Sequence, residues 1–224
     1  MDAIHLFSLP KVRINLHGCK RCHLIYSSFN KRHPRYFIIK RKTVGAALLD
    51  LPTSYQGYLR GKARQALRTN INKATILGYR VTNIHPQDHL DEILAINNSA
   101  QLRQGHKMHK SYTDNDLVQK YLSEVTGMIG AVNSQGKLVG YIDPIYCGEL
   151  IIINRLLGHA NTLDHGVMYL MMADIVKRAI EKKQHGGREK WVMYDMMFGA
   201  SRGLRYFKER LGFKPYLVKW LWQT

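Results

Sequence analysis

Residues 203–213 read GLRYFKERLGF and lead directly into residues 214–222, KPYLVKWLW. The first stretch predicts a short amphipathic helix over Arg202–Leu211 that stops at Gly212, because glycine easily adopts the left-handed conformation that ends many helices. The second stretch alternates in part between apolar and polar residues, which predicts a strand over Lys214–Trp222. The two stretches together predict a helix that turns sharply into a strand, and the other elements follow by working upstream from this pair.

The upstream sequence predicts a regular series of strands and helices. Five further strands are expected, at Tyr79–Ile84, Met128–Val132, Leu138–Tyr146, Glu149–Leu157 and Trp191–Met197, with helices at Gln87–Arg103, Thr113–Val125 and Val167–Lys183. In chain order this gives β-α-α-β-β-β-α-β-α-β. Three successive strands followed by a strand–helix–strand unit predict an α/β (α+β) domain with a mixed, mostly antiparallel twisted sheet flanked by helices.

A long basic helix is predicted over residues 55–77, before the first of these strands. Its apolar residues recur at spacings of three and four: Leu59, Ala63, Leu67, Ile71 and Ala74. Arg60, Arg64 and Arg68 lie four residues apart, so one face of a continuous helix would display all three. Gly78 is a suitable helix stop.

Residues 79–222 resemble the GNAT acyltransferase fold, on the evidence of two motifs. The helix GLRYFKERLGF is similar to the last helix of that fold, which ends in Gly-Phe before the final strand. Its Phe207-Lys208 pair is similar to the one that FemABX peptidyltransferases and their single-domain relatives carry at this place. The basic helix is similar to the R-x-x-L-R-x-x-x-x-K-A-x-x-x-G segment of that branch, here Arg64, Leu67-Arg68, Lys73-Ala74 and Gly78.

The resemblance implies an N-acyltransferase or aminoacyltransferase that moves an acyl group from an activated carrier to an amine. In FemABX-like enzymes the lysine that matches Lys208 is thought to stabilise charge on the reacting carbonyl. Tyr194-Asp195, followed by Gly199, also fits that branch, and Asp195 would orient Lys208 or receive the amine. Tyr206 is a further candidate for the catalytic site.

The sequence departs from the resembled families at two points. FemABX enzymes carry two such domains, and this chain has room for one. Acetyltransferases bind the CoA pyrophosphate with an Arg/Gln-x-x-Gly-x-Gly/Ala loop directly before a helix, but the one formal match here, Arg155 to Ala160, comes too early. Three donors therefore compete: acyl-CoA, acyl carrier protein and aminoacyl-tRNA. No tightly bound cofactor and no metal ion are predicted.

Two regions are predicted to hold the donor's phosphate groups. Backbone N–H groups at a helix N-terminus bind phosphate well, and His165, Gly166 and Val167 open the long predicted helix. Arginine matches phosphate geometry, so the arginines of the basic helix, Arg60, Arg64 and Arg68, are the second candidate group. An ordinary helix start and a solvated charged face are the competing interpretations.

The loop between the first two core helices is predicted to border the acceptor site. It contains His106 and His109, and histidine near its ordinary pKa is a competent general base. We assign His106 as the candidate base and Arg103, His109 and Tyr112 as candidate acceptor-loop residues. The chain has 11 histidines, so an exposed surface position is the competing interpretation for each of these two.

Positive charge is concentrated in the first third of the chain. The net charge is +18, and residues 1–75 hold 15 of the 34 Lys and Arg residues but only two acidic residues, Asp2 and Asp50. We therefore predict a basic N-terminal extension, residues 1–54, followed by the GNAT-like domain, residues 55–224. A basic segment of this kind favours contact with tRNA or another polyanion through residues 1–75. A non-catalytic nucleic-acid-binding module on the same fold is the alternative function, and Tyr26, Tyr36 and Phe37 are the only candidates for base stacking.

The number of cysteines and the length of the apolar runs indicate in which cellular compartment the protein is expected. There are three cysteines, an odd and low number that argues against a disulfide framework. Residues 19–23, CKRCH, match the c-type haem attachment pattern and could also supply zinc ligands, but two free thiols are the preferred interpretation. No apolar run is long enough to span a bilayer, and residues 1–18 do not read as a signal peptide, so a cytoplasmic protein is expected.

Overall fold

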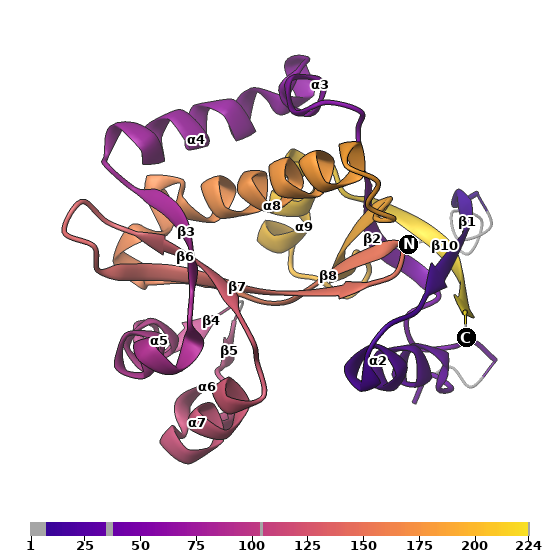
Figure 1. Cartoon of the computed structure of the whole chain (residues 1–224), viewed down its shortest axis with the longest axis horizontal. Coiled ribbons are helices and arrows are strands. Elements are labelled where there is room, and N and C mark those ends of the chain that lie inside the picture. The colour runs from indigo at the N-terminus through magenta and orange to yellow at the C-terminus, as the bar shows by residue number, and fades with distance from the viewer. Residues whose placement is uncertain (1–7, 35–37, 104, 224) are drawn as a thin grey trace. The chain divides into compact units, whose positions relative to one another are not determined.

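The computed structural model describes residues 8–34, 38–103 and 105–223. These residues form two compact units, each built from several pieces of the chain (Figure 1). Unit 1 comprises residues 1–58, 145–153 and 178–224, and unit 2 comprises residues 59–144 and 154–177. Strands β7 and β8 and helix α8 contribute residues to both units.

Unit 1 is a sheet with strand order β1-β10-β2-β9-β8. Its elements are β1 (Lys11–Leu16), α2 (Lys20–Asn30), β2 (Val44–Asp50), α3 (Tyr55–Leu59), β9 (Trp191–Met196), α9 (Arg202–Leu211) and β10 (Lys214–Trp222), with the ends of β7 (Leu138–Cys147), β8 (Leu150–Gly158) and α8 (Val167–Gln184). Strand β1 runs parallel to β10, while β2 runs antiparallel to both β10 and β9. Two strands from the predicted N-terminal extension, β1 and β2, thus pair within this sheet.

Helix α2 covers one face of the unit 1 sheet. Its buried residues Cys22 and Phe29 join a cluster with Ile14, Leu48 and Trp220 from the strands. The Phe29 and Trp220 rings lie 4.9 Å apart, a distance at which aromatic pairs attract each other. The sequence analysis did not predict β1 or α2, although the alternation of polar and apolar residues in Lys11–Leu16 is typical of a strand.

Unit 2 holds the remaining strands, in the order β8-β7-β6-β3. Its elements are η1 (Lys62–Arg64), α4 (Gln65–Ile76), β3 (Arg80–Ile84), η2 (Pro86–His89), α5 (Leu90–Asn98), β4 (Leu102–Arg103), β5 (His106–Lys107), α6 (Lys110–Thr113), α7 (Asn115–Ser123), β6 (Met128–Val132) and η3 (Ala160–His165). Strand β6 is antiparallel to β3 and to β7. Helices α5 and α7 cover one face of this sheet, while α4 and the start of α8 cover the other (Figure 1).

The predicted fold class is confirmed: the sheet is mixed and mostly antiparallel, with helices on its faces. Strand β6, helix α9 and strand β10 begin and end at the predicted residues, and α8 extends one residue further than predicted. The helix predicted from Gln87 instead ends at Asn98, where the chain turns into the hairpin β4–β5. Helix α7 is capped by Asp114, whose carboxylate accepts a hydrogen bond from the Leu117 N–H at 3.1 Å, and not by the predicted pair Thr113 and Asp116.

No helix in the described ranges is both long enough and apolar enough to cross a membrane. The longest, α8, has 18 residues and carries several charged ones.

Candidate active site

Lys208 is a buried cation in unit 1. Helix α9 carries it, starting from Ser201, whose hydroxyl accepts a hydrogen bond from the Leu204 N–H, and ending at Gly212 with a left-handed φ of 101°. Only 1% of Lys208 is exposed, although an amphipathic helix by itself would leave a lysine in solvent. Its Nζ donates to the Met196 carbonyl at 2.7 Å and lies 4.8 Å from the centre of the Tyr194 ring.

The environment of Lys208 disfavours its charge. Burial lowers its pKa from 10.5 to about 8, while the nearby Asp195 carboxylate opposes this shift and Lys42 adds to it. Lys208 forms no ion pair with any residue in the described ranges. A cation held in a dry site without a paired carboxylate is suited to stabilise negative charge that develops on a substrate.

Asp195 lies at the end of β9 in a strained backbone conformation. Its φ is +52°, the only positive value for a residue other than glycine among those described. Such conformations are costly for residues with a Cβ and cluster at functional sites. Its carboxylate pairs with the ammonium group of Lys42, a residue that the sequence analysis did not single out, and 61% of the Asp195 side chain is exposed.

Tyr206 lies on a different side of α9 from Lys208. Half of it (51%) is exposed, and the Arg210 guanidinium lies 4.6 Å from the centre of its ring. Tyr206 is therefore a surface residue that packs beside Arg210. It is not among the described groups that contact the Lys208 ammonium group.

The start of α8 in unit 2 is fixed by close packing against α4. Gly166 has a φ of +82°, and a Cβ added there would lie 2.2 Å from the Asn70 carbonyl oxygen. His165 Nδ1 lies 2.8 Å from the Tyr79 hydroxyl, and Lys73 Nζ donates to the Asp164 carbonyl at 2.8 Å. Val167 is fully buried. The predicted donor residues His165, Gly166 and Val167 thus form a rigid helix start.

The predicted display of three arginines on one continuous helix is wrong. The chain breaks at Gly61, where φ is +94°, so that α3, η1 and α4 replace a single helix over residues 55–77. Arg60 precedes η1, Arg64 ends it, and only Arg68 lies within α4. Arg68 Nη1 donates to the carbonyls of Leu59 and Gly61, at 2.5 and 2.9 Å, and so stabilises the break.

The acceptor-loop candidates lie on the short hairpin and on α6. Arg103 pairs with His106 across the hairpin, and His106 is exposed. Arg103 Nη2 donates to the carbonyls of Ile96 and Gly158, at 2.6 and 3.1 Å, so this side chain ties the loop to the end of β8. His109 caps α6, with Nδ1 accepting from the Ser111 N–H at 3.2 Å.

Tyr112 leads to a partly buried polar cluster that the sequence analysis missed. The guanidinium of Arg155 lies between two aromatic rings, 4.1 Å from the centre of Tyr112 and 3.4 Å from the centre of Tyr121. The Tyr121 hydroxyl donates to the Asp143 carboxylate, and Asn154 Nδ2 donates to the same oxygen at 2.7 Å. The cluster joins α6 and α7 to the middle of strands β7 and β8.

Arg155 retains an unused hydrogen-bond donor in this cluster. Only 8% of the residue is exposed, and Nη1 is buried without a partner among the described residues. The formal CoA-loop match, Arg155 to Ala160, begins within strand β8 and ends at the start of η3, before α8 begins at Val167. The signal that could have pointed to the cluster is a polar pair, Asn154-Arg155, inside the otherwise apolar run LIIINRLLG.

The three cysteines lie together in unit 1. Cys19 Sγ is 3.8 Å from Cys22 Sγ, Cys22 Sγ donates to the Tyr146 carbonyl at 3.3 Å, and Cys147 lies close enough to Cys22 to influence its pKa. Cys19 is exposed at the start of α2, where N–H groups of the helix start lower its pKa, whereas burial raises the pKa of Cys22. No group of His, Cys, Asp and Glu side chains within the described ranges is arranged to hold a metal ion.

Comparisons with known proteins support the fold assignment at low sequence identity. No family model and no curated protein matches the chain. Solved structures that are similar include FemX, with a TM-score of 0.56 and 8% identity over 77% of this chain and 59% of that one. L-PGS from Bacillus licheniformis has a TM-score of 0.52 and 18% identity over 76% of this chain and 57% of that one.

A protein of unknown function from Bacteroides thetaiotaomicron has a TM-score of 0.52 and 16% identity over 77% of this chain and 56% of that one. The chain thus spans less than three fifths of the length of each of these structures. At such low sequence identity, structural similarity shows only that the folds are alike. The chain has a GNAT-like fold of the FemABX type.

Proposed function

We propose that the protein is an N-acyltransferase or aminoacyltransferase, which moves an acyl group from an activated carrier to an amine. The observation that carries the proposal is the burial of Lys208 on the last helix of a GNAT-like fold, with a pKa lowered to about 8. A fold of this type hosts several activities, so the proposal depends on this side chain more than on the fold.

Lys208 is proposed to stabilise the oxyanion that forms when the amine attacks the carrier's carbonyl carbon. The Met196 carbonyl at 2.7 Å and the Tyr194 ring hold the ammonium group in place before substrate binds. Because its pKa is about 8, Lys208 remains mostly protonated at pH 7. Asp195 favours this charged form, and the ion pair with Lys42 holds its carboxylate.

Unit 2, taken by itself, offers two candidate substrate-binding groups. The start of α8 at His165, Gly166 and Val167 offers backbone N–H groups to a phosphate of the carrier, which is acyl-CoA, acyl carrier protein or aminoacyl-tRNA. The loop with Arg103, His109 and Tyr112 is proposed to border the amine acceptor, and His106 to act as its base. Arg155, whose Nη1 is unused, is a further candidate for holding a negatively charged group of either substrate.

The proposal is tested by comparing wild type with Lys208→Met and Lys208→Arg in a transfer assay. Each carrier class is supplied separately with a mixture of amine acceptors, and mass spectrometry reads the acylated product. Loss of an oxyanion donor lowers kcat by about 10²–10³-fold, so the methionine variant should fall by that factor. Lys214→Met, which replaces an exposed lysine on β10, is the matched control. Full turnover by Lys208→Met would refute the assignment.

The alternative function is a non-catalytic module that binds nucleic acid or another polyanion. The excess of basic residues in the first third of the chain favours it. It predicts tight, salt-dependent binding that Lys208→Met leaves intact, together with no turnover of any carrier by wild type.

A further inference from the structure

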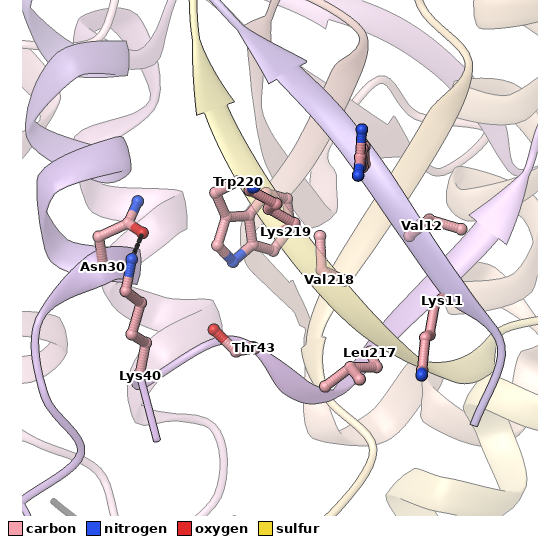
Figure 2. A pocket seen from close by; sticks show the side chains of 10 residues that line it. Lys11, Val12, Asn30, Lys40, Thr43, Leu217, Val218, Lys219 and Trp220 are labelled. Carbon is pink, nitrogen blue, oxygen red and sulfur yellow. Dashed lines mark hydrogen bonds between the residues drawn. The ribbon is translucent and has the colours of Figure 1, made fainter. Parts of the chain in front are cut away.

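A basic pocket lies in unit 1, among β1, β10 and the segment that follows α2 (Figure 2). Its volume is about 540 Å³, within the range of pockets that hold small ligands. Lys11 and Arg13 contribute from β1, Lys219 from β10, and Lys40 from the segment before β2. The pocket shares no residue with the candidate active site.

The described part of the chain does not neutralise the cations of this pocket. None of the described residues that line it is acidic, and the side chains of Lys11, Arg13 and Lys219 make no ion pair or hydrogen bond with the described part of the chain. Lys40 donates to the side-chain oxygen of Asn30 at 2.7 Å, which is a neutral partner (Figure 2). Among the described residues, nothing compensates the positive charge of this pocket.

The strand register places two of these cations side by side. Arg13 is the direct partner of Lys219 in the parallel ladder between β1 and β10. Like charges opposite each other on neighbouring strands destabilise a sheet. A bound anion would remove this repulsion, whereas no acidic side chain among the described lining residues does so.

The remaining lining groups suit a phosphate ester. Thr43 also lines the pocket, and its hydroxyl oxygen is buried without a partner in the described structure. Val12, Leu217 and Val218 supply apolar surface beside the charges. A single carboxylate would leave most of the four positive charges uncompensated, whereas a strand of phosphodiesters brings one negative charge per nucleotide and flat apolar bases.

We propose that this pocket binds a segment of single-stranded nucleic acid, with Lys11, Arg13, Lys40 and Lys219 contacting successive phosphates. The binding itself does not depend on the proposed function. Only the identification of that strand with the tRNA of an aminoacyl donor rests on the transferase activity.

The test measures the fluorescence anisotropy of a short labelled RNA oligonucleotide over a series of KCl concentrations. The proteins are wild type, the double variant R13Q/K219Q, and the control K20Q/K214Q, which removes the same charge from exposed positions of the same unit outside the pocket. A charge-assisted contact accounts for about tenfold in affinity, so R13Q/K219Q should bind about 100-fold more weakly. Its slope of log affinity against log salt should become shallower by about 1.4, while the control retains most of the affinity.

Three results would overturn the proposal. Equal weakening by R13Q/K219Q and K20Q/K214Q would mean that net charge alone attracts the RNA. Binding of a nucleoside monophosphate, but not of the oligonucleotide, would identify a free nucleotide as the ligand. Binding to phosphatidylglycerol vesicles that R13Q/K219Q abolishes, with no binding of RNA, would identify a membrane surface. Lys208→Met should bind the oligonucleotide as wild type does, so a failure of the transferase proposal remains distinguishable.

Discussion

At the scale of single residues, the burial of Lys208 links stability to the proposed chemistry. In the unfolded chain its pKa is the ordinary 10.5, and in the folded protein it is about 8. Between these two values the unfolded chain binds more protons, so the contribution of Lys208 to the free energy of unfolding increases as the pH rises. The charged form, which the proposed function requires, is the form that destabilises the fold.

The Lys208→Met variant should therefore be more stable than wild type at pH 7, by up to about 3 kcal/mol. The difference should decrease as the pH rises from about 8 to 10.5, since wild-type Lys208 becomes neutral over that interval. Urea unfolding of both proteins at pH 7, 8.5 and 10 measures it, and other titrating groups cancel in the comparison. A difference that is independent of pH would contradict the burial-driven shift in pKa.

The backbone of Asp195 allows a second comparison between two variants. Asp195→Gly and Asp195→Ala both remove the carboxylate and its pair with Lys42, but only alanine keeps a Cβ at φ +52°. The glycine variant should be more stable than the alanine variant by about 1–2 kcal/mol. Thermal unfolding of the two proteins measures this, and equal stabilities would mean that the backbone at residue 195 relaxes.

The thiols of Cys19 and Cys22 should form a disulfide when the protein is treated with oxidised glutathione. The Cys19 thiolate attacks the glutathione disulfide and releases one glutathione thiolate, and the Cys22 thiolate then attacks Cys19 Sγ and releases the second. A modest movement closes the 3.8 Å between the sulfurs to a bond of about 2.05 Å. Thiol titration and peptide mapping measure the loss of two thiols, which Cys147→Ser should leave unchanged and Cys19→Ser should abolish. A Cys22–Cys147 disulfide would contradict this pairing.

At the scale of elements, the start of α8 depends on its approach to α4. Gly166→Ala adds a Cβ 2.2 Å from the Asn70 carbonyl oxygen and at a positive φ. Backbone atoms cannot move aside cheaply, so this variant should lose more than about 2 kcal/mol of unfolding free energy. Gly136→Ala is the control, because its φ is +80° but no atom lies within 4 Å of the added Cβ.

The control should lose only about 1 kcal/mol, which is the cost of the backbone conformation alone. Urea unfolding of the two variants beside wild type separates the two costs. Similar losses for Gly166→Ala and Gly136→Ala would show that α4 and the start of α8 are not in tight contact.

At the scale of the whole molecule, the net charge of +18 is the dominant electrostatic feature. Repulsion among like charges destabilises a folded state, and dissolved salt screens it over a Debye length of about 10 Å at 0.1 M. The melting temperature should therefore rise between low and moderate NaCl concentrations. Calorimetry or far-UV circular dichroism measures this rise, and a melting temperature that falls with added salt would mean that attractive ion pairs dominate.

The sequence by itself determined the order of elements over residues 79–222, because apolar periodicity and glycine stops are local properties. It also singled out Lys208 and the excess of positive charge.

Only the tertiary structure decided which charges lose contact with water. It buried Lys208 at 1% exposure, placed Arg155 between two tyrosine rings and brought Cys147 close to Cys19 and Cys22. It also broke the predicted basic helix at Gly61 and added β1 and β2 to the sheet. These features depend on strand pairing and packing between residues far apart in sequence, which local periodicity does not determine.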